Sequence, residues 1–278
     1  MEGRRGLIVG VANDHSIAWG IARRLAEEGA ELAFTYQTPA LAKRVIPLAK
    51  SLGSDFVLPC DVSLPLDADD PGTLSAMFRA LGRRWPTIDF AVHAVAFSDR
   101  NELRGRYAET TRDNFARTLL ISCFSFTEFA AHAAPLMPKG GSLLTLTFGG
   151  STRVMPNYNV MGVAKAALEA SVRYLAVDFG PKNIRVNAIS AGPVRTLAGA
   201  GVSDARLMFN YQRRNAPLRR TVSIEEIGNT AVYLLSDLAS AVTGEIHFVD
   251  SGYNIIAMPP IDELKAADTA EADSEAAE

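Results

Sequence analysis

The sequence predicts an α/β protein, a single-domain Rossmann fold whose doubly wound parallel sheet of about seven strands carries helices on both faces. Three observations lead to this prediction. Short apolar runs alternate with segments of helical period along the chain. Several runs lack strict alternation, which is typical of strands buried on both faces of a parallel sheet. The chain has 278 residues, of which 48% are hydrophobic, enough to form one large core.

The expected strands are spaced so that a helix fits between most of them, as parallel pairing requires. They are Leu7–Val9, Glu31–Tyr36, Asp55–Leu58, Ile88–Val95, Ser142–Phe148, Arg185–Ser190 and Ile246–Val249. The segments of helical period are Ile17–Glu28, Thr73–Arg84, Asp113–Ala134 and Asn159–Phe179. Residues 263–278 are mostly Ala, Glu and Asp, so we expect an acidic, disordered tail there.

Composition and charge argue against several classes of protein. The formal net charge of -3 disfavours a nucleic-acid or anionic-membrane surface, because both need a clustered positive field. Cys60 and Cys123 are too few for a disulfide framework, which favours a reducing compartment. The start of the chain lacks the pattern of a secretory signal, and no apolar run reaches the roughly 20 residues of a membrane helix. We expect a cytoplasmic protein without metal, nucleic acid or membrane partners.

The turn after the first strand resembles those that hold a dinucleotide pyrophosphate. Leu7–Val9 ends in Gly10, and the helix that begins near Ile17 contains Gly20. Backbone N–H groups and the helix dipole would face the phosphates, and glycine allows close approach. The spacing differs from GxGxxG, so the pattern alone leaves open a purely structural N-cap role for Ser16.

Two further strand ends favour a bound dinucleotide. Phe34–Gln37 closes the second strand, where an adenosine ribose would lie. Asp61 follows the third strand and could reach the adenine amine, although taken alone it would be a plain helix cap. Gln37 stands where NAD enzymes place an acid and NADP enzymes an arginine, and its amide neither repels nor clamps a 2′-phosphate. The predicted cofactor is NADH, and NADPH is not excluded.

Tyr158 and Lys165 form the candidate catalytic pair. They are seven residues apart on the helix after the fifth strand, so two helical turns place them on one face. The phenol could face a substrate oxygen and the ammonium the cofactor ribose. We expect the ammonium to favour the phenolate, since a nearby opposite charge lowers the pKa of a phenol. Such a pair also occurs on many ordinary helices. His93, inside the fourth strand, is predicted to be a core or cofactor-pocket group and not a base.

Four segments together resemble the bacterial enoyl-[acyl-carrier-protein] reductases, divergent members of the short-chain dehydrogenase/reductase superfamily. They are Gly10–Gly20, Ala33–Gln37, Pro156–Lys165 and Arg185–Thr196, within a resemblance that runs from about Gly6 to Met258. The seven-residue Tyr–Lys spacing is its most specific element. Ordinary short-chain dehydrogenases place the tyrosine four residues before the lysine, where this chain has Met161.

The resemblance implies a role for each matching residue. Tyr158 would bind the thioester carbonyl and Lys165 the nicotinamide ribose, while Phe97 and Ser98 would line the substrate with Tyr158. The residues implied to bind the cofactor are Gly10, Ser16, Ile17, Gln37, Asp61, Val62, Val95, Lys165, Val194, Thr196 and Ala198.

The resemblance also implies the organisation of the chain. A substrate lid around 195–215 would belong to a reductase domain of residues 1–262. Without the resemblance, we expect a surface helix there that packs with Leu207 and Phe209 inward. The implied substrate is an enoyl group on acyl carrier protein, and the implied assembly is a homotetramer. The long helix Asp113–Ala134 could serve an interface.

Two positions depart from the family pattern. Enoyl reductases usually carry a second tyrosine at the end of the fifth strand, where this chain has Phe148, as some members do. A phenylalanine keeps the apolar wall but loses a donor, worth roughly 1–3 kcal/mol if that donor met a buried oxygen. Ala96 replaces a common glycine. These departures bear on substrate preference more than on activity.

The expected reaction is hydride transfer from NADH to the β-carbon of a trans-2-enoyl thioester, the last step of the fatty-acid elongation cycle. Tyr158 would stabilise the oxyanion that forms on the thioester. Two alternatives stay open. The chain could be another short-chain reductase acting on a carbonyl, against which Met161 counts, or a non-catalytic NAD(H)-binding homologue.

Overall fold

Seven parallel strands form the centre of the computed structural model, which describes residues 1–194, 196, 204–262, 264 and 265. The strands are β1 (Arg5–Val9), β2 (Glu31–Tyr36), β3 (Val57–Pro59), β4 (Phe90–His93), β5 (Gly141–Thr147), β6 (Ile184–Ala191) and β7 (Ile246–Val249). Their order across the sheet is β3-β2-β1-β4-β5-β6-β7. All six neighbouring pairs run parallel. The predicted fold class is confirmed.

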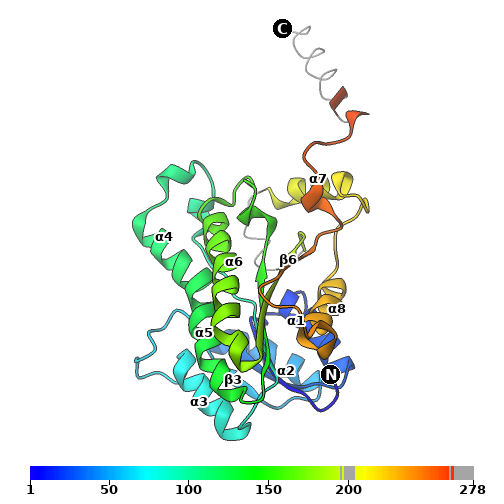
Figure 1. Cartoon of the computed structure of the whole chain (residues 1–278). Coiled ribbons are helices and arrows are strands. Elements are labelled where there is room, and N and C mark those ends of the chain that lie inside the picture. Colours follow the sequence, from blue (N-terminus) through cyan, green and yellow to red (C-terminus); the bar gives the residue numbers. More distant parts are fainter. Residues whose placement is uncertain (195, 197–203, 263, 266–278) are drawn as a thin grey trace.

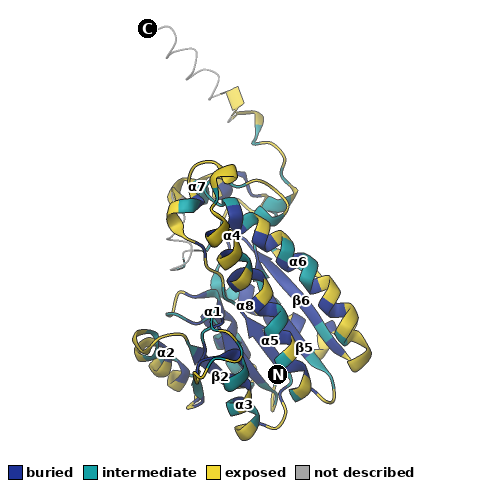
Figure 2. Ribbon diagram, turned by 90° about the vertical axis from the view of Figure 1, so that its left-hand side faces the viewer, coloured by how far each residue is buried: buried dark blue, intermediate teal, exposed yellow. Residues whose placement is uncertain are grey.

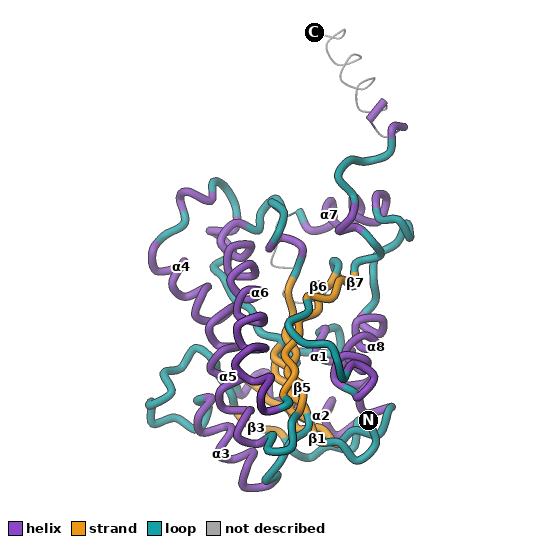
Figure 3. Tube along the Cα trace, in the orientation of Figure 1, coloured by secondary structure: helices purple, strands orange, loops and turns teal. Residues whose placement is uncertain are grey.

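Two layers of helices enclose this sheet (Figure 1). One layer holds α3 (Leu74–Arg84), α4 (Arg112–Leu119), α5 (Ser125–Ala133) and α6 (Asn159–Phe179). The other holds α1 (Ile17–Glu27), α2 (Pro39–Ser51) and α8 (Ile224–Leu235). Figure 3 shows the sheet edge-on between these layers, with α7 (Ala205–Asn215) beyond one end of the strands.

Each layer buries a core against its own face of the sheet, because successive strand residues point to opposite sides. Leu7 and Val9 pack with α3, α5 and α6, whereas Ile8, between them, packs with α1, α2 and α8. Figure 2 shows the result as a buried sheet under helices whose outer faces are exposed. The near-continuous apolar strands of the sequence thus reflect a sheet covered on both sides.

Several predicted boundaries were wrong, each for a local reason. The fourth strand ends at His93 and not at Val95, because β1, which pairs with it, ends at Val9. The predicted continuous helix Asp113–Ala134 is interrupted by one π-helical turn, η3 (Leu120–Phe124). Helices α2 and α8 were not predicted, although a capping box formed by Ser223 and Glu226 marks the start of α8.

The stretch Arg112–Leu136 is long and apolar enough to cross a membrane by length and composition, contrary to the sequence-based expectation. Half of its apolar window is buried inside the protein. Phe126, Phe129 and Ala133 are fully buried and belong to the core beneath the sheet. This is the position of a core helix.

Candidate active site

The predicted site residues gather at the carboxyl ends of the parallel strands. Chain connections leave β1 and β4 in opposite directions across the sheet, which is where ligands bind in open α/β folds. A cavity of about 440 Å³ opens there, between the loops after β1 and β6, helix α7 and the start of α8. His15, Val194 and Ile224 are among the residues that line it.

The loop after β1 packs closely against the loop after β4. Gly10 has φ +112°, and a Cβ there would lie 2.2 Å from the Ala94 carbonyl oxygen. The Ser16 hydroxyl accepts from the N–H groups of Ala12 and Asn13 at 3.0 and 3.1 Å. Ser16 is the N-cap residue of α1, but its side chain makes no cap bond to that helix. Ser16 shapes the loop that precedes Ile17.

Gly20 has a packing role. A Cβ on it would lie 2.5 Å from the Ile224 carbonyl oxygen of α8. A Cβ on Gly228 would lie 2.7 Å from the Gly20 carbonyl oxygen. The two glycines let α1 and α8 pack closely, which fixes both helix starts beside the cavity.

The ends of β2 and β3 bring Gln37 and Asp61 together. The Gln37 amide donates to Asp61 Oδ2 at 3.0 Å, and Asp61 Oδ1 accepts from the backbone and hydroxyl of Ser63 at 2.9 and 2.7 Å. Burial raises the pKa of Asp61, but these hydrogen bonds outweigh it and the pKa is lowered. Asp61 therefore closes a turn and caps no helix, with Val62 buried behind it. The pair is placed where an adenosine would lie.

Helix α4 and the π-turn clamp the loop after β4. The Ser122 hydroxyl accepts from Phe97 N–H and donates to its carbonyl, both at 2.9 Å. Ser98 is buried, and its hydroxyl accepts from Thr118 on α4 at 2.9 Å. Phe97 is 40% exposed, whereas Val95 packs on the core. Phe97 is thus open to a substrate, while the side chain of Ser98 anchors the loop.

Tyr158 lies at the start of α6 against Phe148, which follows β5. Their ring centroids are 5.1 Å apart in an edge-on arrangement. Burial, with a contribution from the nearby Glu169 carboxylate, raises the pKa of the phenol. The expectation that Tyr158 is a phenolate is therefore wrong, because the pKa of its hydroxyl is raised and not lowered. Tyr158 stays protonated and can donate a hydrogen bond.

Two asparagines in the left-handed backbone region flank Tyr158. Asn157 has φ +57° and Asn159 φ +31°, a region that asparagine tolerates better than most residues. The Asn159 amide lies 3.3 Å from the carbonyl oxygens of Glu102 and Gly105. These contacts tie the turn that carries Tyr158 to the loop after β4.

Lys165, on α6, is 6% exposed and follows Tyr158, the N-cap residue of that helix, by seven positions. Its ammonium donates to the Leu146 carbonyl oxygen of β5 at 2.7 Å. Burial lowers its pKa to about 8, although Cys123 and Glu169 act in the opposite direction. Lys165 is therefore a buried cation at neutral pH with donors left for a ligand.

The segment after β6 is described only in part. Thr196 N–H donates to the Val194 carbonyl at 2.8 Å. Ala198 and most of the predicted lid before α7 lie outside the described residues, as does the tail except for Leu264 and Lys265. In α7, Leu207 is 68% exposed, so its predicted inward packing is wrong.

His93 is confirmed as a buried core group. The Ser125 hydroxyl donates to the Ile121 carbonyl at 2.7 Å, so it accepts from His93 Nε2–H at 2.9 Å. Nδ1 then carries no proton, and among the described residues it has no hydrogen-bond partner. Burial, with the Lys165 charge, lowers the pKa of His93 to about 3. The ring is neutral and is not a base at physiological pH.

This burial predicts a pH-dependent loss of stability. The pKa of His93 falls from 6.5 when unfolded to about 3 when folded, so the unfolded chain gains a proton first as pH falls. At pH 5 we expect a cost of about 2 kcal/mol relative to neutral pH. Urea unfolding at pH 7.5 and 5 should show this cost in the wild type and not in His93→Gln. The exposed His15→Gln is the control; an equal pH effect in His93→Gln would refute the assignment.

Sequence reasoning missed three side chains that support this site. Ser122 and Glu169 are polar residues on helix faces that are otherwise apolar, which is the one signal that could have found them. Thr147, at the end of β5, is buried and donates to Glu169. All three act through tertiary contacts.

The glycine turn, the paired Gln37 and Asp61, and the Tyr158–Lys165 pair define a dinucleotide-dependent oxidoreductase of the short-chain dehydrogenase/reductase type. A family model described as "Enoyl-(Acyl carrier protein) reductase" matches residues 10–254. The chain belongs to this enoyl-[acyl-carrier-protein] reductase family, which confirms the resemblance.

Curated relatives and solved structures agree over nearly the full length. "Enoyl-[acyl-carrier-protein] reductase [NADH] 2" of Rhizobium meliloti (strain 1021) is 67% identical, over 96% of this chain and 98% of the relative. The FabI reductase of Salmonella typhimurium is 47% identical, over 95% and 99%. The crystal structure of FabI from Candidatus Liberibacter asiaticus has a TM-score of 0.89 and 59% identity, covering 93% and 98%. The Anaplasma phagocytophilum reductase, solved in complex with NAD, has a TM-score of 0.88 and 53% identity, covering 94% and 97%.

Proposed function

We propose that this protein reduces the double bond of a trans-2-enoyl thioester carried on acyl carrier protein, with NADH as reductant. The supporting observation is that Tyr158, the N-cap residue of α6, packs against Phe148 while Lys165 is buried on that helix, with Met161 at the position of the ordinary tyrosine. Met161 cannot donate a proton, which counts against carbonyl reduction. The relatives named above as NADH-dependent reductases support the same reaction.

The residues present fit a bound dinucleotide, because the loop after β1 runs from Gly10 to the start of α1 at the carboxyl end of the sheet and Lys165 presents a buried cation. Gly10, Ser16 and Ile17 would hold the pyrophosphate, Gln37 and Asp61 the adenosine, and Lys165 the nicotinamide ribose. The bound NADH would supply a hydride to the β-carbon of the substrate.

Tyr158 stabilises the negative charge that develops on the substrate. Its protonated hydroxyl donates a hydrogen bond to the thioester oxygen, where negative charge collects as the double bond is reduced. The low exposure around Tyr158 and Phe148 strengthens this interaction, because water screens it less. Protonation at the α-carbon then completes the saturated acyl thioester. Phe148 supplies an apolar wall and no second donor.

The consumption of NADH by the purified protein tests this proposal. We expect oxidation with a medium-chain trans-2-enoyl thioester, and little with a 3-oxoacyl thioester. NADPH, run in parallel, decides the cofactor. Oxidation with the oxoacyl substrate alone would identify a carbonyl reductase instead. NADH binding without turnover of either substrate would identify a non-catalytic homologue.

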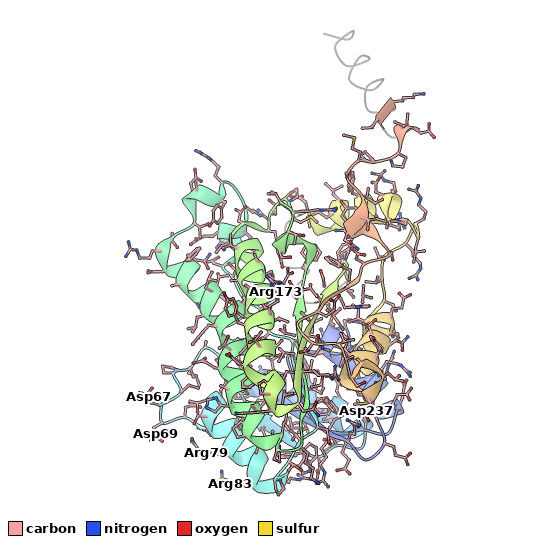
Figure 4. The ribbon with its side chains drawn as sticks, in the orientation of Figure 1. Asp67, Asp69, Arg79, Arg83, Arg173 and Asp237 are labelled. Atoms are coloured by element: carbon pink, nitrogen blue, oxygen red, sulfur yellow. The ribbon has the colours of Figure 1, made fainter. Side chains whose placement is uncertain are left out.

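Two exposed arginines, one at the start and one near the end of α7, support docking of the acidic carrier protein. Arg206 and Arg213 are exposed, and Arg213 lines the cavity. Arg206→Ala with Arg213→Ala should raise the KM for the carrier-bound substrate several-fold and leave that for an uncharged N-acetylcysteamine thioester unchanged, since exposed charges mainly steer association. Arg79→Ala with Arg83→Ala is the matched control, because Figure 4 shows both on α3, at the far end of the molecule. An equal increase in KM from the two double substitutions would contradict the proposal that α7 is the docking surface.

An apolar surface on α4, η3 and α6 supports the homotetramer. Tyr174 and Val177 are 77% and 75% exposed on α6, and Phe124 of η3 is 50% exposed. Helix α6 packs against α4 and η3, and Figure 1 shows α4 and α6 in the same helix layer. A second copy of this chain would bury them, and the molar mass in solution tests this.

The proposal also places the protein in the cytoplasm, with residues 1–262 as the reductase domain.

A further inference from the structure

Helix α6 carries a second buried charge, one helical turn after Lys165. Glu169 is 6% exposed, and its neighbours Leu168 and Val172 are fully buried. A carboxylate in such surroundings is costly unless polar groups compensate it. The Thr147 hydroxyl donates to Glu169 Oε1 at 2.7 Å. This hydrogen bond places the Glu169 carboxylate against the end of β5.

The two charges of α6 contact consecutive residues of β5. Lys165 Nζ donates to the Leu146 carbonyl oxygen at 2.7 Å, and Glu169 accepts from Thr147. Their separation of four residues puts them on one side of the helix. Because Thr147 and Leu146 hold each group separately, Glu169 can act on Lys165 as a charge without occupying all its donors.

The other titratable groups that face Lys165 are neutral near pH 7. His93 on β4 and Cys123 on η3 interact with Lys165, and Tyr158, just before α6, interacts with Glu169. Burial raises the pKa of the Cys123 thiol and of the Tyr158 phenol, and lowers that of His93 to about 3. Glu169 is therefore the negative charge that opposes the Lys165 ammonium among these titratable groups.

We propose that Glu169, anchored by Thr147, is a positioning residue that keeps Lys165 an ammonium at the ribose side of the cofactor site. The inference rests on the proposed function, in which Lys165 holds the nicotinamide ribose. A neutral amine there would be a weaker donor, since charge-assisted hydrogen bonds are roughly twice as strong as neutral ones. Glu169 thus affects cofactor binding without touching the cofactor.

Glu169→Gln tests the charge at nearly constant shape, since its amide oxygen can still accept from Thr147. The NADH dissociation constant should be measured by fluorescence titration between pH 6 and 9. In the wild type we expect binding to weaken as Lys165, whose pKa is about 8, loses its proton. In Glu169→Gln this midpoint should move down by about one pH unit, so that binding above both midpoints is about tenfold weaker. At pH 6 the two proteins should bind alike.

Two further variants make this result specific to the charge. Glu169→Asp keeps a carboxylate, though one methylene further from Thr147, and should move the midpoint less than Glu169→Gln does. Glu128→Gln removes another partly buried carboxylate, on α5, and should change nothing. An unmoved midpoint in Glu169→Gln, or an equal movement in Glu128→Gln, would overturn the inference. If Glu169→Gln does not fold, Thr147→Val replaces it in the test. Removing the Thr147 hydroxyl loosens the Glu169 carboxylate and should also move the binding midpoint down. An unmoved midpoint in Thr147→Val would overturn the inference as well.

Binding and turnover separate this inference from the proposed reaction. A shifted binding midpoint in a protein that does not reduce enoyl thioesters would support the role of Glu169 and refute the reaction. Enoyl reduction with an unshifted midpoint would refute the role of Glu169 alone. In an active enzyme, the alkaline limb of the kcat/KM profile should move with the binding midpoint.

Discussion

Replacing Tyr158 by Phe should lower kcat for enoyl reduction by about 10²–10³-fold, the usual effect of losing one donor to a developing oxyanion. The Phe148 contact should survive, because the ring remains. The pKa of the phenol is raised by burial, so the wild-type group acts as a neutral donor and the whole effect comes from one hydrogen bond. The dissociation constant of NADH should stay within about twofold, since nothing assigns the hydroxyl to the cofactor. Stopped-flow single turnovers together with NADH titration measure both quantities.

Tyr107→Phe is the matched control for this variant. Tyr107 is 48% exposed in the loop after β4, and losing its hydroxyl should leave turnover unchanged. An undiminished rate in Tyr158→Phe would remove Tyr158 from the mechanism. A comparable loss in both variants would point to a general effect of the loop after β4.

Replacing Lys165 by Met should weaken NADH binding and turnover together. The ammonium is a charged donor in a buried site, and losing such a hydrogen bond costs about 1.5–3 kcal/mol, or roughly 10–150-fold in the dissociation constant. Turnover should fall further, because a misplaced nicotinamide also spoils the approach to the substrate. NADH titration and initial rates at saturating cofactor separate the two effects.

The stability of this variant needs its own measurement, because Glu169 would lose the cation that faces it. Buried charges left without compensation destabilise a fold. Thermal unfolding would show this, and Lys165→Arg, which keeps a cation, should lose less binding than Lys165→Met. Lys182→Met, an exposed lysine just after α6, should behave as wild type. Intact NADH binding in folded Lys165→Met would refute the assigned contact.

Much of this fold could be predicted from the sequence because its signals are local. Strands buried on both faces are continuous apolar runs, and β2 and β7 begin and end at the predicted residues. The helix that carries Lys165 was predictable from its period, whereas Tyr158 is the N-cap residue just before it, so helical spacing alone does not fix the geometry of the pair. The family resemblance then supplied roles for residues, such as Gln37 and Asp61, whose types alone are ambiguous.

The remaining features depend on contacts between distant segments. The direction of the Tyr158 pKa follows from burial and from Glu169, neither of which a sequence pattern measures. Ser122 contacts Phe97 across 25 positions of sequence, and Thr147 contacts Glu169 across 22. The exposure of Leu207 on α7 likewise depends on what surrounds the helix. Such side chains are recognisable in a sequence only as polar residues on apolar faces.

The π-turn between α4 and α5 makes this part of the chain intolerant of changes in length. A π-turn amounts to one residue added to an α-helix. Deleting one residue from 120–124 would restore the regular period and turn α4 by about 100° relative to α5. With Phe126 and Phe129 held in the core, Ser122 would no longer face Phe97. Homologues that preserve the loop clamp should therefore align here without a gap, and a one-residue indel would mark those that bind substrate differently.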